Sequence, residues 1–303
     1  MRDAATLFLL LAALGAGCAS APAEQPPQPD RVAPDGVKPQ ETPVPEPLTA
    51  KTLGPLLAKS EQRLIASRRS ITAASTALEG WAALTSIGDQ LGDAFKARGA
   101  ELTWKRSNTR ARVRTLIEEV WSPGSLSLGT SYNQCEGSTL THHISSEALK
   151  HALASEREQT LPEFLADQTA TAFRAALDQL AGADRGLDAA TAPVTSSLAT
   201  ANATANSLNP ALTAWEASEP EAREAAAAKI RGILESLDGE ITAALPGIRA
   251  LCAAADAHAK ASLGVSEELR TLAKSLGRWI ESLGEDAPPE LRETWERLRP
   301  EGD

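Results

Sequence analysis

The sequence predicts an all-α fold: an antiparallel bundle of long, kinked helices with coiled-coil-like seams and one irregular loop insertion. Over most of residues 48–303, apolar residues recur in alternating steps of three and four, which is the spacing of one helix face. Alanine and other helix formers dominate, whereas aromatic residues that favour strands are scarce, with one Tyr and four Phe. These two observations together place residues 48–303 in a helical bundle domain.

The first helical segment covers residues 49–121. Its stripe has leucine or isoleucine at every seventh position, at Leu57, Leu64, Ile71 and Leu78. A spacing of seven is typical of coiled-coil packing. Glycines within residues 88–99 weaken the stripe and predict a break or bend there. A further helix ends at residues 122–124, whose sequence is Ser-Pro-Gly.

Residues 122–145 contain the sequence SLSLGTSYNQCEGSTLT, which differs from the rest of the domain. Apolar and polar residues alternate here, and glycines flank the stretch in the manner of turns. We therefore expect an irregular loop in residues 122–145, with room for a short hairpin.

The second helical segment covers residues 146–215. Thr160 and Glu163 have the spacing of a capping box, so a new helix is expected to begin there. Its apolar face continues to Trp215 in steps of three and four through residues rich in Ala, Thr, Ser and Asn. Pro193 is expected at a helix start or a kink because proline lacks the backbone N–H.

The third helical segment covers residues 219–284, after a second capping-box pattern from Ser218 to Glu221. Sixteen positions then follow the three–four alternation from Ile230 to Leu283 without a slip, and Gly284 is expected to end the helix. A short amphipathic helix is predicted around residues 291–298.

Two assemblies of these segments are consistent with the sequence. Three straight helices of about 70 residues would give an up–down–up bundle about 105 Å long. Sharp breaks within residues 88–99 and at Pro193 and Pro246 would instead give a shorter bundle of four to six helices, which we favour. In the shorter bundle Cys135 and Cys252 could meet and pair as a disulfide, the alternative being two separate thiols.

The N-terminus has the features of an export signal. Arg2 precedes an apolar run over residues 4–17, which is too short to cross a bilayer of about 30 Å. The sequence LGAGC at residues 14–18 resembles the lipobox of bacterial lipoproteins, with its leucine one place further from the cysteine. The resemblance implies a signal peptide at residues 1–17 and lipidation of Cys18; an ordinary secreted protein cut nearby is the alternative. Ala19, by the same analogy, favours the outer membrane.

Residues 18–47 are compositionally separate from the domain. Nine of the nineteen prolines lie in residues 21–47. Because proline cannot donate to a helix or a sheet, we expect a disordered, extended tether that spaces the domain from a lipid surface.

The charge of the chain bears on its partners. Acidic residues exceed basic ones by ten, which makes an exported chain a poor nucleic-acid binder. Residues 96–114 nevertheless hold seven basic residues. These basic residues form either a patch for an anionic ligand or a solvated helix face that pairs with the acidic residues of 281–301.

The candidate site residues are few. His143, Glu147 and His151 share one helix face at spacings of four, which suits Zn²⁺ weakly; the alternative is a loop-to-helix junction. His258 stands in the apolar stripe and is either a core histidine with one hydrogen-bond partner or a pH-sensitive element. We find no catalytic signature and no cofactor motif.

The sequence therefore predicts a membrane-anchored bacterial lipoprotein of the cell envelope, facing the periplasm or the surface. Its helical domain would act as a scaffold or bind a partner, which would be an envelope protein or polymer. The alternative is a periplasmic protein that binds a small ligand or metal through residues 122–151.

Overall fold

The computed structural model describes residues 49–97, 109–154, 160–165 and 170–296. The chain divides into two units, Met1–Val44 and Pro45–Asp303. The predicted signal peptide (1–17), Cys18 and the predicted tether (18–47) lie outside the described residues.

The described residues form helices and no strands, which confirms the predicted all-α class. Four helices are long: α1 (Ala50–Ala97), α2 (Thr109–Ala154), α4 (Ala170–Asn206) and α6 (Arg223–Leu283). The remaining elements are short: α3 (Leu161–Phe164), α5 (Leu208–Glu216), the 3-10 turn η2 (Gly284–Asp286) and α7 (Pro289–Glu296). None of these helices contains a stretch both long enough and apolar enough to cross a bilayer.

The long helices form two antiparallel hairpins. In the first, α1 packs against α2, with Leu57 beside His142 and Arg68 beside Tyr132, so the residue numbers run in opposite directions. In the second, α4 packs against α6 in the same antiparallel way. The predicted antiparallel packing is therefore confirmed within each hairpin.

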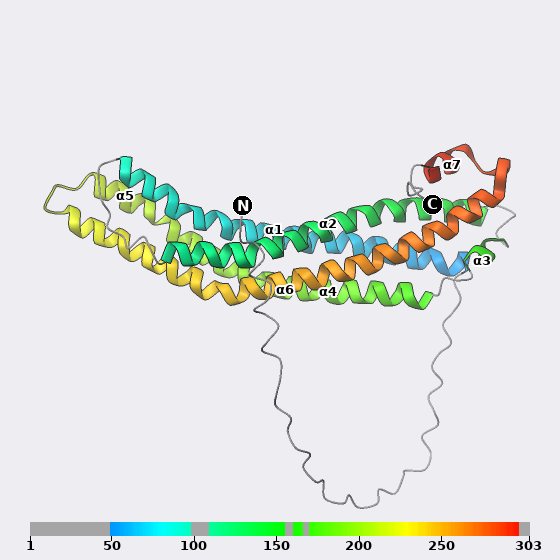
Figure 1. Ribbon diagram of the computed structural model, residues 1–303, viewed down its shortest axis with the longest axis horizontal. Helices are drawn as coiled ribbons and strands as arrows, with labels where there is room; N and C mark the ends of the chain where they lie inside the picture. The colour runs from blue at the N-terminus through cyan, green and yellow to red at the C-terminus, as the bar shows by residue number, and fades with distance from the viewer. Residues whose placement is uncertain (1–48, 98–108, 155–159, 166–169, 297–303) are drawn as a thin grey trace, which may run out of the picture. The chain divides into compact units, whose positions relative to one another are not determined.

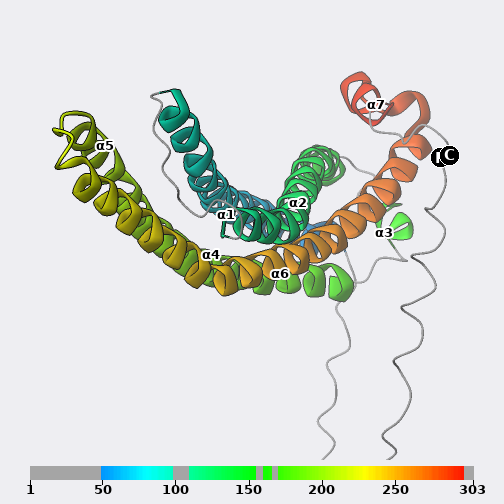
Figure 2. The same cartoon turned by 60° about the vertical axis from the view of Figure 1, so that its left-hand side comes forward.

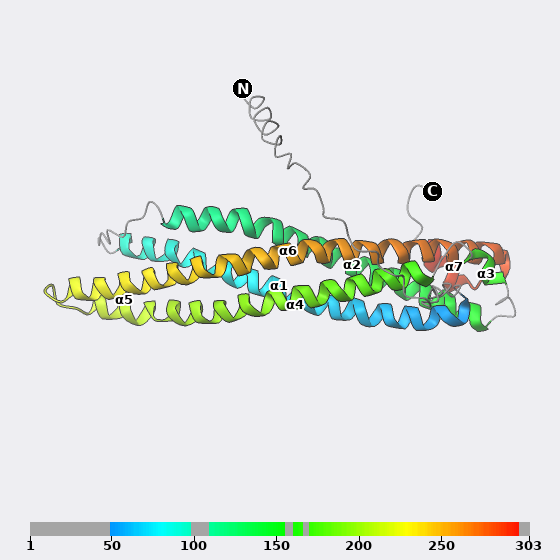
Figure 3. The same cartoon turned by 90° about the horizontal axis from the view of Figure 1, so that it is seen from below.

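The two hairpins lie side by side, with α1 against α4 and α2 against α6 (Figures 1, 2 and 3). Contacts between α1 and α4 join Ser67 to Asp184 and Trp81 to Val194, so these two helices run in the same direction. Each long helix thus has two long neighbours, and side chains from all four helices meet in one core. The sequence divided the domain into three long segments and favoured a bundle of four to six helices, and the described residues form four long helices.

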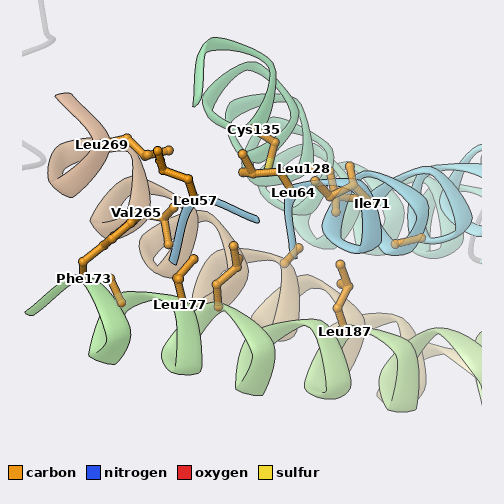
Figure 4. Close-up of a cluster of buried hydrophobic side chains, with 14 of the residues drawn as sticks. Leu57, Leu64, Ile71, Leu128, Cys135, Phe173, Leu177, Leu187, Val265 and Leu269 are labelled. Carbon is orange, nitrogen blue, oxygen red and sulfur yellow. The ribbon is translucent and has the colours of Figure 1, made fainter. Parts of the chain in front are cut away.

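The predicted helical stripes form this core. All sixteen positions of the α6 stripe, from Ile230 to Leu283, are buried. The α1 residues at spacing seven, from Leu57 to Leu78, are buried as well. Figure 4 shows apolar side chains from the four long helices meeting in the core, including Leu57 from α1 and Leu177 from α4.

The prediction of an irregular loop at residues 122–145 is wrong, because α2 is helical from Thr109 to Ala154. Its buried face does follow steps of four and three, but small and polar residues occupy many of its positions. The positions in these steps are Gly124, Leu128, Ser131, Cys135, Ser138, His142, Ser145, Leu149 and Ala152, and Ile144 and Ala148 beside them are buried as well. A stripe with few apolar side chains does not look like a helix when apolar residues alone are followed.

The sharp breaks at Pro193 and Pro246 that the shorter bundle required are absent, because α4 and α6 continue through both prolines. Both prolines are exposed, as is Pro123 in α2. A proline leaves one backbone carbonyl of the preceding turn without its helical partner. On an exposed face water can satisfy that carbonyl, so the helix persists. The glycines at residues 88 and 92 do not end α1 either; residues 98–108 lie outside the described residues.

The predicted helix ends vary in accuracy. Gly284 ends α6 with a φ of 60°, a conformation that glycine adopts without strain. A helix does begin at Thr160 as predicted, although α3 is only four residues long and Thr160 makes no side-chain capping hydrogen bond. The start predicted at Ser218 is wrong, because α6 begins at Arg223. At the C-terminus, the Trp295 ring of α7 lies directly over Gly277 of α6, where a side chain would collide with it.

Candidate functional site

A buried polar layer crosses the core and includes residues from all four long helices. Its members are Ser67, Ser131, Cys135, Asp184, His258 and Ser262. None of these residues is more than 6% exposed. The layer interrupts the apolar stripes of four helices at the same level, so its polar groups can pair with one another.

His258 is the centre of the layer. Its Nε2 lies 2.9 Å from Asp184 Oδ1, which also accepts a hydrogen bond of 2.7 Å from Ser67 Oγ. Its Nδ1 lies 2.5 Å from Ser131 Oγ and 3.2 Å from Ser262 Oγ. The prediction of a core histidine with a hydrogen-bond partner is therefore confirmed, although it has more partners than the single one expected.

Burial sets the charge balance of the layer. A buried carboxylate is costly unless it is paired or hydrogen-bonded, and Asp184 Oδ1 has two such partners, His258 and Ser67. The second carboxylate oxygen, Asp184 Oδ2, is buried with no hydrogen-bond partner among the described residues. Cys135 Sγ lies 3.7 Å from Ser262 Oγ, and burial raises the pKa of this thiol, so it stays neutral.

The layer contains the same groups as a hydrolase triad, but its burial argues against that chemistry. Nucleophilic catalysis needs the serine oxygen to reach a substrate carbonyl. Ser131 and His258 are both 0% exposed, so no substrate atom can contact them in this structure. The role that fits these residues is to fix how the helices align with one another. A buried polar group stabilises the bundle only in the alignment of helices that brings its hydrogen-bond partner beside it.

The predicted metal candidates do not come together as a site. Glu147 is exposed and pairs with Lys150, and the hydrogen bond from that lysine lowers the pKa of the carboxyl. The His151 ring packs against Trp279 with 6.2 Å between ring centroids, while His143 is exposed. Within the ranges that the structure describes, no three His, Cys, Asp or Glu side chains are grouped to hold a metal ion.

Neither of the two domain cysteines forms a disulfide among the described residues, and the two contact different parts of the α2–α6 interface. Cys135 lies beside Ser262, whereas Cys252 lies beside Gly124. Cys252 and Ser262 are ten residues apart on α6, or about 15 Å along the helix. The disulfide considered from the sequence is therefore not formed in this structure. Two other predicted sites, Cys18 and the basic side chains of residues 96–114, lie outside the residues whose side chains are described.

The outward side of α2 carries a second notable feature, which we call the α2 face. It is formed by residues three or four apart on the exposed side: Leu126, Gly129, Asn133, Gly137 and Leu140. Leu126 is 74% exposed and Leu140 is 56% exposed, higher fractions than those of the other large apolar side chains found exposed. No atom would contact a side chain added at Gly129 or Gly137, so the space over the middle of this face is open.

The α2 face continues into a shallow groove against α1. The groove has a volume of about 380 Å³. Its α2 wall includes Gly129, Tyr132 and Asn133, and its α1 wall includes Thr72 and Glu79. Tyr132 is fixed there by Arg68, whose guanidinium carbon lies 5.5 Å from the ring centroid and which donates a 3.3 Å hydrogen bond to the hydroxyl.

Sequence reasoning found His258 but missed its partners and the α2 face. Asp184 does have a detectable signal, because it stands in the stripe Leu180, Asp184, Leu187, where an apolar residue is expected. A charged residue at a core position implies a buried partner on another helix. The α2 face had no such signal while residues 122–145 were interpreted as a loop.

Comparison with known proteins gave no match to a family model, to a curated protein or to a solved structure.

Proposed function

We propose that this chain is a bacterial cell-envelope lipoprotein held at a membrane by Cys18, and that its helical domain is a scaffold that binds a partner through the α2 face. The lipobox-like sequence at residues 14–18 supports the anchor. The observation that carries the binding role is the exposure of Leu126 and Leu140 on one side of α2.

These two leucines have the placement of contact residues. They are fourteen residues apart, which is four turns or about 21 Å along the helix. Both are exposed to water, although each would gain roughly 1.5–3 kcal/mol on full burial. Between them stand two glycines and Asn133, so a partner segment can approach the helix backbone while its ends contact the leucines.

The rest of the described domain favours binding over catalysis. The polar layer is closed to substrates, and its groups already bond to one another. The α2 face, by contrast, is open and is continuous with the groove against α1. A helical segment of an envelope protein fits this surface, since a helix can lay an apolar side along such a face. An extended envelope polymer is the other partner class.

Photo-crosslinking in cells tests this proposal. A photoreactive amino acid replaces Leu126 or Leu140 in the full chain, and a third variant carries it at Leu263, which is 40% exposed on α6. We expect one crosslinked species at both α2 positions and its absence at position 263. Equal crosslinking at all three positions, or none at the α2 positions, would contradict the proposed binding face.

A further inference from the structure

A cationic groove lies between the first turns of α1 and α4. It has a volume of about 350 Å³. Its lining residues are Lys51, Thr52, Pro55, Leu56, Lys59 and Arg174. Three of these six side chains are positively charged, although the whole chain carries a net charge of −10. A local concentration of cations in an acidic protein points to an anionic ligand.

Further cations extend the positive charge along the same edge of the two helices. Lys59 pairs with Asp178 of α4 at 2.9 Å. The hydrogen bond from Lys59 lowers the pKa of Asp178, and the charges of Lys59, Arg63 and Arg185 lower it further. Arg63 and Arg185 are therefore close enough to this carboxylate to affect it, so the positive field reaches beyond the groove.

Five cations lie along this edge: Lys51, Lys59, Arg63, Arg174 and Arg185. Helical spacing puts two carboxylates, Asp178 and Asp188, on the same flank of α4. Among these named side chains, cations outnumber carboxylates.

The position of the groove in the chain suggests which anion it meets. Lys51 and Thr52 belong to the first turn of α1, the described helix that begins nearest in sequence to Cys18. If Cys18 carries lipid, this is the end of α1 that the chain connects to the bilayer. The chain between Cys18 and α1 would then link the groove to the bilayer. Contact between the groove and the headgroups would be intramolecular, so the local concentration of headgroups would be high.

We propose that this groove binds the phosphate groups of anionic lipid headgroups at the membrane surface. Lysine and arginine donate charge-assisted hydrogen bonds to phosphate oxygens, and the apolar side chains of Pro55 and Leu56 can contact the adjoining glycerol. The inference rests on the proposed envelope location, and it adds a second, reversible membrane contact to the covalent anchor.

Vesicle binding of the full chain tests the inference. All proteins compared carry Cys18→Ser, so no lipid is attached to any of them. Residues 1–17 are identical in all of these proteins. The groove variant is Lys51→Gln, Lys59→Gln and Arg174→Gln. The control variant is Lys150→Gln, Lys229→Gln and Arg270→Gln, three exposed cations on other faces, which gives it the same net charge. Circular dichroism checks that each variant keeps its helix content.

The readout is the ratio of affinities for phosphatidylglycerol vesicles and for neutral phosphatidylcholine vesicles, measured by co-sedimentation. We expect the parent and the control variant to prefer the anionic vesicles and the groove variant to lose about tenfold or more of that preference. We also expect added salt to weaken binding of the parent, because salt screens exposed charges. Equal ratios for the groove and control variants would overturn the inference.

A second arm identifies the source of the phosphate. Calorimetry with inorganic phosphate is run on the same proteins. Phosphate binding that the groove variant loses, without any preference for anionic vesicles, would assign the groove to a soluble anion and overturn the lipid proposal. Neither arm depends on Cys18 lipidation or on the α2 face, so failure here is distinct from failure of the proposed function.

Discussion

At the scale of single residues, the Asp184–His258 pair places two ionisable groups in the described core. Both groups are buried, and they are bonded at 2.9 Å. The attraction between such groups offsets the cost of removing them from water only when both are present. Loss of either one leaves the other with an uncompensated charge or an unsatisfied polar atom.

A double-mutant cycle measures this interdependence. We expect His258→Leu and Asp184→Leu each to lower the free energy of unfolding by about 3–5 kcal/mol, because each removes the ionisable partner of the other group in the core. The double variant should lose much less than the sum of the two. Urea denaturation gives the values.

The matched control for this cycle is His143→Leu, the same substitution at an exposed histidine, which should change stability by about 0.5 kcal/mol or less. Additive losses in the double variant would show that the pair does not act as a unit.

At the scale of helices, close approach of α2 to α6 depends on Gly124. A Cβ atom at this position would lie 3.0 Å from Cys252 Cβ and 3.3 Å from its Cα. The nearest atom, Cys252 Sγ, belongs to a side chain that can rotate away, but the Cβ and Cα of Cys252 move only with the backbone of α6. A glycine that looked like a helix terminator in the sequence is therefore a packing residue.

Two alanine substitutions in α2 separate packing from helix propensity. Gly124→Ala should lower the free energy of unfolding, because the collision with Cys252 costs about 1–3 kcal/mol. Gly137→Ala should raise it by up to about 1 kcal/mol, because no atom lies near the added methyl group and alanine favours helix. Thermal or urea unfolding of both variants gives the comparison. A stabilised Gly124→Ala variant would contradict the close contact.

The helices also show what the sequence could predict and why the rest could not be predicted. The α6 stripe was predicted in full, because leucine and isoleucine mark most of its positions. The α2 stripe was missed, because serine, cysteine, glycine and histidine hold positions such as Ser131 and Cys135. Such residues are buried only where another helix supplies partners, and that information is tertiary.

At the scale of the whole molecule, the helical class followed from composition and periodicity, but the pairing of hairpins did not. The parallel contact of α1 with α4 depends on specific pairs, such as Ser67 with Asp184, that are 117 residues apart in the chain. The polar layer and the α2 face appear only once those distant segments are aligned. Local patterns therefore predicted the helices, while the candidate sites required the assembled bundle.

The proposed function as a whole depends on the anchor at Cys18. The most direct measurement is mass spectrometry of the N-terminal peptide from protein extracted from membranes. We predict that the mature chain begins at Cys18 and that this residue carries the mass of a thioether-linked diacylglycerol. An unmodified Cys18, or a mature chain that begins at any other residue, would contradict the account.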